Sequence, residues 1–204
     1  MEGSVAPTMA HYFDRRPHSP SQPRHLELVL PDRTLDLVSD AGVFAADRID
    51  PGTKLLLLDM PAPPPVGHLL DLGCGYGPIA VTLALRSPGA TVWAVDVNER
   101  ARQLTAQNAA AAGCTNVRVA EPHDVPADIS FAALASNPPI RIGKTALHEL
   151  LSTWLVRLDP DASASLVVQR HLGADSLAGW LAGEGWQVTR LRSRAGYRLL
   201  EVRR

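Results

Sequence analysis

Cysteine is scarce in this chain of 204 residues, which holds only Cys74 and Cys114. Two thiols cannot form a disulfide framework or a cysteine cage for a metal ion. His123 and Asp124 stand side by side, but they have no partner ligands at a suitable spacing, so we expect no metal site. Because chains without disulfides are typical of a reducing compartment, we expect a cytoplasmic protein.

Long apolar runs are also absent. The longest, Leu55–Leu58 and Ile79–Leu85, fall far short of the ~18–20 apolar residues that cross a bilayer. The N-terminal stretch MEGSVAPTMAHYFDRRP lacks the apolar core of a secretory signal peptide. We therefore expect no membrane partner and no export.

The chain also lacks an excess of either sign of charge, since its net charge is −1. This excludes a globally basic protein that coats nucleic acid. The charge is unevenly spread, however. Residues 186–204 hold six arginines against one glutamate, a net +5, so the other 185 residues carry −6. A neutral total is therefore compatible with a local basic surface that holds one polyanionic substrate.

The chain divides into three parts. Residues 1–24 hold four prolines and no apolar periodicity, which predicts a flexible arm. Residues 25–65 begin with two alternating runs around a Pro-Asp pair, typical of a hairpin. Asp50 and Pro51 follow, and this pair is typical of the start of a helix. We expect the hairpin and helix to pack on a catalytic domain formed by residues 66–204.

Predicted strands and helices alternate after residue 65. The strands are expected at 67–72, 90–95, 117–120, 131–136, 164–169, 187–191 and 198–202. The helices are expected at 76–86, 98–112, 144–158 and 175–183, the last of them capped by Asp175. This alternation predicts an α/β fold, a doubly wound and mostly parallel sheet of seven strands. The last two strands are joined too briefly for a parallel crossover, so one of them runs antiparallel.

Three of the predicted strand ends carry distinctive residues, and ligands bind at the carboxyl ends of such strands. The first is Asp71-Leu72-Gly73-Cys74-Gly75-Tyr76-Gly77, whose glycines permit a sharp turn and a close approach of backbone to ligand. Its spacing differs from the G-x-G-x-x-G of dinucleotide folds. Asp71 would repel a pyrophosphate but can accept hydrogen bonds from an ammonium or hydroxyl group. A cationic cofactor without phosphate therefore fits better than a nicotinamide dinucleotide.

Asp96 follows the second predicted strand of the sheet. A carboxylate at this place can accept hydrogen bonds from both hydroxyls of a ribose. It can also cap the helix that begins near Asn98. Its position downstream of Asp71 favours the ribose role.

The third strand end is Ser136-Asn137-Pro138-Pro139. Its prolines fix the backbone and remove two N–H donors, so the Asn137 amide oxygen and the Pro138 carbonyl can face one point as acceptors. Such a pair holds a planar amino group and turns its nitrogen lone pair toward an electrophile. An ordinary turn at a strand end is the alternative, and the other two motifs weigh against it.

Together these residues resemble the class I S-adenosylmethionine-dependent methyltransferases of the N-P-P group. Over about residues 40–204 the chain is similar to the ribosomal RNA small-subunit guanine-N2 methyltransferase C family, of the methyltransferase small domain type. The stretches that carry the resemblance are GVFAADRIDPGTKLLLLDMP (42–61), DLGCGYG (71–77), AVDVNERA (94–101), SNPPIRIGK (136–144), VVQRHLGADSL and SRAGYRLLEV.

The resemblance implies a class I methyltransferase fold and S-adenosyl-L-methionine as cofactor. It also implies a reaction, methylation of the exocyclic N2 of a guanine in ribosomal RNA of the small subunit, 16S type. The partner would be that RNA or the small ribosomal subunit. The oligomeric state stays open.

The resemblance also assigns residues. Those implied to hold the cofactor are Asp71, Gly73, Gly75, Gly77, Asp96, Val97 and Asn137. Those implied to be catalytic, by holding the target amino group, are Asn137, Pro138 and Pro139. Those expected to face the substrate are Ile140, Arg141 and Lys144, joined by Arg170 at the same predicted edge of the sheet. Those implied to lie over the cofactor pocket are Phe44, Asp50 and Thr53.

The sequence departs from the family pattern in three ways. Ile140 stands where an aromatic residue is often found, and Ala132 where an acidic residue is usual. The larger family members also have a second, amino-terminal methyltransferase-like copy, whereas this chain has only the short arm.

Alternative interpretations follow from the same residues. In the first alternative, the enzyme methylates an amino group of a protein or small molecule. In the second, the chain is a non-catalytic RNA or ribosome-assembly module. Arg141 and Lys144 fit a solvated helix start as well as phosphate contacts. Arg190, Arg192 and Arg194 fit either an RNA track or the wet face of an edge strand.

Overall fold

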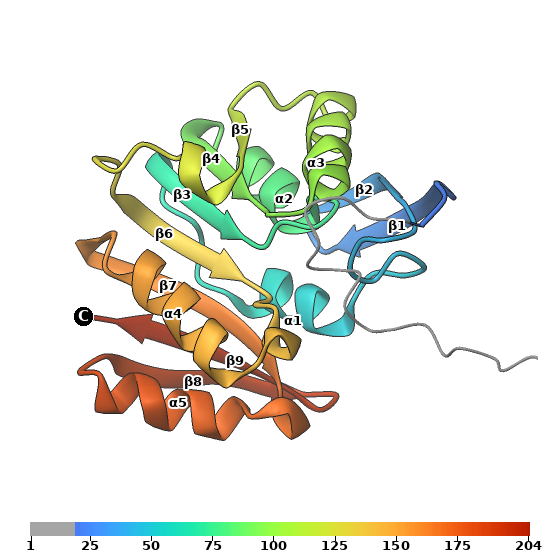
Figure 1. Cartoon of the computed structure of the whole chain (residues 1–204). Helices are drawn as coiled ribbons and strands as arrows, with labels where there is room; N and C mark the ends of the chain where they lie inside the picture. The colour runs from blue at the N-terminus through green and yellow to red at the C-terminus, as the bar shows by residue number, and fades with distance from the viewer. Residues whose placement is uncertain (1–18) are drawn as a thin grey trace, which may run out of the picture.

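The computed structural model describes residues 19–204, and its centre is one seven-stranded sheet (Figure 1). The strand order is β5-β4-β3-β6-β7-β9-β8. The bounds are β3 (Val66–Leu72), β4 (Gly89–Val95), β5 (Val117–Ala120), β6 (Phe131–Ser136), β7 (Leu158–Gln169), β8 (Gln187–Arg194) and β9 (Tyr197–Arg203). Strand β9 runs antiparallel to its two neighbours, β7 and β8, and the other pairs of the sheet are parallel. The predicted fold class is confirmed.

Helices cover both faces of the sheet because the strand residues alternate between two cores (Figure 1). Leu69 and Val167 join the core under α1, α2 and α3, whereas Leu70 and Leu166 join the core under α4 and α5. The helix bounds are α1 (Pro51–Asp59), α2 (Pro78–Arg86), α3 (Glu99–Ala111), α4 (Lys144–Leu155) and α5 (Ala174–Gly183). No helix within residues 19–204 is long and apolar enough to cross a membrane.

Three details of the predicted elements are wrong. The helix predicted over 144–158 ends at Leu155, three residues early. Strand β7 begins at Leu158, which pairs with Phe131, and not at residue 164. The start of the strand is polar and contains Pro160, so its sequence lacks an apolar alternation. Asp175 does not cap α5, because Gly173 occupies the cap position with φ 101°. The Asp175 carboxylate instead forms ion pairs with arginines of β8 and β9.

The hairpin of β1 (Arg24–Leu30) and β2 (Arg33–Ser39) lies beside α3 (Figure 1). The buried Asn108 side chain of α3 joins them. It accepts a hydrogen bond from Val38 N at 2.8 Å and donates to Val38 O at 2.8 Å. It also donates to Tyr76 O at 2.7 Å. One amide therefore ties the hairpin to the loop between β3 and α2.

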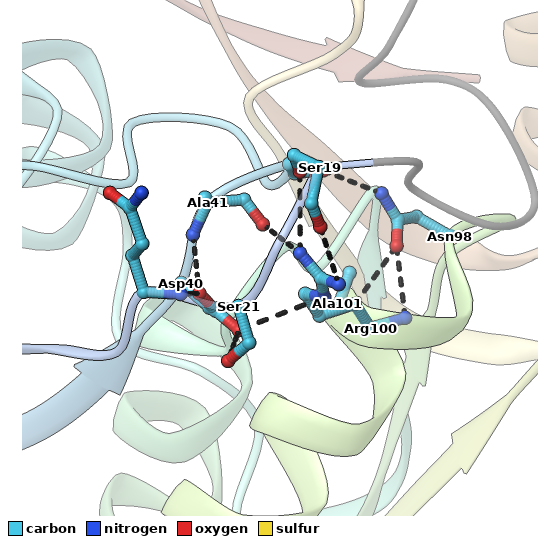
Figure 2. A network of polar contacts seen from close by, with 9 residues as sticks. Ser19, Ser21, Asp40, Ala41, Asn98, Arg100 and Ala101 are labelled. Carbon is cyan, nitrogen blue, oxygen red and sulfur yellow. Dashed lines mark hydrogen bonds and ion pairs between the residues drawn. The ribbon is translucent and has the colours of Figure 1, made fainter.

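The residues before the hairpin contact the start of α3 (Figure 2). Arg100 donates to Ser19 O at 3.0 Å and to Ala41 O at 2.5 Å. Ser21 donates to Asp40 at 2.7 Å, and Asp40 lies 3.7 Å from Arg100. The predicted flexible arm covered residues 1–24, and residues 1–18 lie outside the described part of the chain.

We expect Asn108→Ala to lower the free energy of unfolding by about 3 kcal/mol, because it leaves one buried and two partly buried backbone groups without partners. Urea denaturation measures the change. Gln107→Ala, which removes an exposed amide from the same helix, serves as the control and should change stability by less than about 0.5 kcal/mol. Equal midpoints for the two variants would contradict the role assigned to Asn108.

Candidate active site

The three motifs found in the sequence meet at one edge of the sheet. Asp71 of β3 is in register with Ala94 of β4 and Ala135 of β6, so the three parallel strands end at the same level. The glycine loop after β3 crosses to β4, where Gly73 N donates to Val95 O at 2.8 Å. A Cβ built on Gly73 would lie 3.9 Å from the Pro139 ring. The loop therefore lies between the Asp96 and Asn137 strand ends.

The glycines of this loop differ in their surroundings. Gly75 has φ 57°, and a Cβ placed on it would meet nothing within 4 Å. That open space is where a ligand could approach the backbone. A Cβ on Gly77 would meet Thr105 at 3.0 Å, so Gly77 serves the close packing of α2 on α3. Cys74 is buried, and burial together with the Asp96 and Asp71 carboxylates raises the pKa of its thiol, so it stays protonated.

Asp71 is fully buried at the end of β3. One oxygen, Oδ2, accepts from Ala80 N at 2.9 Å in the first turn of α2. The other, Oδ1, is buried without any hydrogen-bond partner. Burial, with a smaller effect of the Asp96 charge, raises the pKa of Asp71 to about 8. An unpartnered, buried carboxylate oxygen beside an open glycine loop fits a cationic ligand group such as an ammonium.

Asp96 lies between the glycine loop and the start of α3. Its Oδ2 accepts from Gly75 N and its Oδ1 from Asn98 N, both at 2.9 Å. Asn98, and not Asp96, caps α3, since its side chain accepts from Arg100 N and Ala101 N. Burial raises the pKa of Asp96 although these hydrogen bonds oppose the shift. Each carboxylate oxygen retains a lone pair, so a diol can still bind here, beside the 38% exposed Val97.

Asn137 follows β6, and both hydrogens of its amide group are engaged. Its Nδ2 donates to Asp50 Oδ1 at 2.8 Å and to Thr53 Oγ1 at 3.0 Å. The amide orientation is thereby fixed, and Asn137 Oδ1 can act only as an acceptor. Asp50 and Thr53 were expected over the cofactor pocket, and the structure places them against the Asn137 side chain.

Pro138 and Pro139 begin a tight turn. The Pro138 carbonyl accepts from Ile140 N at 2.8 Å, and the Pro139 carbonyl accepts from Ile142 N at 3.1 Å. The Pro138 oxygen therefore keeps one of its two lone pairs for another donor. Asn137 Oδ1 and Pro138 O thus both keep acceptor capacity.

The residues expected to face the substrate lie along this edge. Ile140, in a short 3-10 turn (Ile140–Ile142), packs against the core under α4. Arg141 and Lys144 are exposed between β6 and α4. Arg170 is exposed after β7, the neighbouring strand, and its backbone N donates to Gly196 O at 2.7 Å. The structure thus brings these cations to the same side of the sheet as Asn137.

Several C-terminal arginines are already paired with carboxylates. Arg190 and Arg198 both bind Asp175. Arg192 lies 3.1 Å from Asp59 of α1, and Arg203 lies 2.8 Å from Glu201. Glu201 is already counted in the local charge of +5, so the pairs with Asp175 and Asp59 lower that charge to +3. Among the described residues, no three His, Cys, Asp or Glu side chains gather as metal ligands would.

Sequence reasoning missed Tyr197 of β9. Its hydroxyl donates to Asp50 Oδ2 at 3.2 Å. The ring needs Gly52, because a Cβ there would lie 2.5 Å from the ring carbons. Nothing in the sequence links a tyrosine in the last strand to an aspartate 147 positions earlier.

The model of the methyltransferase small domain family matches residues 34–201 of this chain. The chain belongs to the methyltransferase small domain family. The match covers the hairpin from β2 onward, the glycine loop, the Asn137 turn and the C-terminal strands, and so confirms the resemblance found in the sequence.

Known relatives agree with this membership. The chain is 32% identical to protein YbxB of Bacillus subtilis over 95% of its own length and 98% of that protein. It is 36% identical to ribosomal RNA small subunit methyltransferase C of Aeromonas hydrophila, over 69% of this chain but 42% of the relative. The solved T. thermophilus 16S rRNA N2 G1207 methyltransferase (RsmC), in complex with AdoMet and guanosine, shares the fold with TM-score 0.69 and 22% identity. That alignment covers 91% of this chain and 51% of the neighbour. The chain thus spans about half the length of these methyltransferase C proteins.

Asp71 should destabilise the protein as the pH rises. Its pKa is raised in the folded state, so between about pH 4 and pH 8 the folded chain holds a proton that the unfolded chain releases. We expect Asp71→Asn to stabilise the ligand-free protein, with a gain that grows by about 1–3 kcal/mol from pH 5 to pH 7. Urea unfolding at both pH values measures it, and a gain independent of pH would refute the assignment.

Proposed function

We propose that this protein is an S-adenosylmethionine-dependent N-methyltransferase that methylates the exocyclic N2 of a guanine in small-subunit ribosomal RNA. The observation that carries the proposal is the fixed orientation of Asn137. Both amide hydrogens are bound to Asp50 and Thr53, which fixes the amide and leaves Oδ1 as an acceptor for a substrate. Such a group selects a substrate that offers N–H donors.

The residues at the glycine loop fit S-adenosylmethionine. The buried Asp71 Oδ1 without a partner would accept from the ammonium group of the cofactor. Asp96 would accept from the ribose hydroxyls, and Val97 would lie beside the adenine. Gly73 and Gly75 would let the backbone approach. The cofactor supplies a methyl group activated by its sulfonium charge.

Asn137 and Pro138 would act on the target nitrogen by position. Two acceptors on the two hydrogens of a planar amino group hold it in place and favour the nitrogen lone pair as nucleophile. The same acceptors stabilise the positive charge that develops on the nitrogen as it attacks. As the nitrogen takes the methyl group, the bond from sulfur to that methyl breaks and S-adenosylhomocysteine leaves. The methylated nitrogen is then acidic enough to release its proton to water, so no strong base is needed.

Ribosomal RNA is the substrate class favoured by the exposed cations at this edge. Arg141, Lys144 and Arg170 surround the strand ends and suit phosphate contacts. The methyltransferase C relatives are named for ribosomal RNA, and they support the same substrate. Ile140 would pack against the base without stacking on it as an aromatic ring does. The cytoplasmic location stays a prediction.

A protein or small-molecule amino group is the alternative substrate. The ion pairs of Arg190, Arg192 and Arg198 favour it to some degree, because they leave these arginines less available to RNA phosphates. The non-catalytic RNA-binding alternative is weakened by the intact Asn137 arrangement. A module without activity has no use for an amide fixed by two buried partners.

Replacement of Asn137 should separate binding from transfer. We expect Asn137→Ala to keep its affinity for S-adenosylmethionine within about threefold and to lose about a hundredfold in methyl transfer. Calorimetry measures binding, and transfer of radiolabel from the cofactor measures activity. Gln107→Ala should match the wild type in both. Transfer by Asn137→Ala at the wild-type rate would show that the role is wrongly assigned.

The substrate class is tested with labelled cofactor and separated RNA, ribosomal particles and protein from a strain that lacks the enzyme. We expect label in RNA, as a guanine methylated on N2 after digestion. Binding of that RNA should weaken steeply with salt. Arg170→Ala should lower the salt slope by about one. Arg118→Ala, which removes an exposed arginine within the edge strand β5, should not. Label in the protein fraction would favour the alternative.

A further inference from the structure

A chain of polar contacts behind Asn137 joins three elements that are far apart in the sequence. Asp50, at the N-terminus of α1, is 8% exposed and lies at its centre. Its Oδ1 accepts from Thr53 N at 2.9 Å and from Asn137 Nδ2 at 2.8 Å. Its Oδ2 accepts from the Tyr197 hydroxyl at 3.2 Å. Both carboxylate oxygens are thus engaged, and each contact comes from a different part of the fold.

Tyr197 is held in place by the backbone around it. The turn before it has Ala195 at φ 50° and Gly196 at φ 82°, a pair of left-handed residues that joins β8 to β9 tightly. Tyr197 is the first residue of β9 and pairs with Gln169 of β7. Its ring lies against Gly52, where a side chain would collide with it. The tight hairpin of β8 and β9 therefore holds the Tyr197 hydroxyl next to Asp50.

The hydrogen bond from Asn137 Nδ2 to Asp50 directly affects the Asn137 amide. A carboxylate that accepts from the amide N–H polarises the amide group and makes Oδ1 a stronger acceptor. This effect requires that Asp50 keeps one orientation, and the Tyr197 hydroxyl restrains its second oxygen. Burial and the Asp50 charge raise the pKa of Tyr197, so the hydroxyl remains a donor throughout the neutral range.

We propose that Tyr197, acting through Asp50, is a positioning residue that aligns and polarises the Asn137 amide for methyl transfer. The inference rests on the proposed function, and it adds a part of the site drawn from the C-terminal hairpin. Packing alone does not account for the hydroxyl, since the ring would fill the same space without it. In the described structure the hydroxyl has one hydrogen bond, the one to Asp50.

The test is Tyr197→Phe, which keeps the ring against Gly52 and removes only the hydroxyl. We expect kcat to fall about tenfold, the effect of one hydrogen bond to a charged group. The affinity for S-adenosylmethionine should stay at the wild-type value, and the melting temperature should fall by only a few degrees, because Asp50 Oδ2 loses one hydrogen bond. Asp50→Asn should lower kcat further, because asparagine still caps α1 but one acceptor is lost. Thr82→Val, which removes a buried hydroxyl bound to Pro78 O, should leave kcat unchanged.

A second measurement does not depend on activity. The chain has four asparagines, Asn98, Asn108, Asn116 and Asn137, so their side-chain amide signals can be assigned by NMR from single substitutions. We expect Tyr197→Phe to shift the Asn137 signal and to speed the exchange of its amide hydrogens with solvent. The Asn108 signal, from an amide bound to Val38 and Tyr76, should stay in place.

The outcomes separate the two proposals. No methyl transfer by the wild type to any amino substrate would refute the proposed function, while the NMR comparison still tests the coupling of Tyr197 to Asn137. With an active wild type, a Tyr197→Phe variant that keeps both kcat and the Asn137 signal would overturn the inference. So would a loss of kcat matched by an equal fold loss of cofactor affinity, since that pattern indicates a purely structural role.

Discussion

The parallel register of β3 with β4 and β6 is the constraint on which the site depends. It brings three strand ends to one level, so that positions 71, 96 and 137 lie at the same edge of the sheet. The hydrogen bonds from Gly73 N and Cys74 N to Val95 O then fold the glycine loop over the end of β4. Without that closure, Gly75 N would not reach the Asp96 carboxylate. The backbone of the sheet therefore places the polar groups before any ligand arrives, which is what preorganisation requires.

The fold could be predicted from the sequence because its core obeys a simple period. The strand at 67–72 is mostly apolar and ends in a glycine turn, and helices such as the one at 144–158 show apolar residues at helical spacing. The errors arose where that signal is missing. Strand β7 starts in a polar stretch around Pro160, and Asp175 does not cap α5 because Arg190 and Arg198, distant in sequence, attract its carboxylate. Local pattern carries no information on such tertiary partners.

The candidate site could be predicted only where its residues form local motifs. The motifs at 71–77, 96 and 137–139 are local, and the residues around Asn137 became visible only in three dimensions. Asp50 stands 87 positions before Asn137, and Tyr197 stands 147 positions after Asp50. Gly52 is the single trace of this arrangement in the sequence, because it makes room for the Tyr197 ring. Glycine is tolerated in the first turn of helices for its backbone freedom alone, so its presence there does not reveal a distant aromatic partner.

Asp71 and Asp50 are both buried carboxylates, but they differ in the hydrogen-bond partners that the protein gives them. Asp71 is left with an oxygen that has no partner, which costs stability until a cation binds. Asp50 has both oxygens engaged, so its carboxylate already has all the partners it needs for a positioning role. Asp71 therefore keeps one oxygen unused for a ligand, whereas each oxygen of Asp50 already holds a neighbouring residue. The same logic extends to the arginines: those paired with Asp175 and Asp59 secure α5 and α1, whereas Arg170 stays exposed on the side of the sheet where a substrate would arrive.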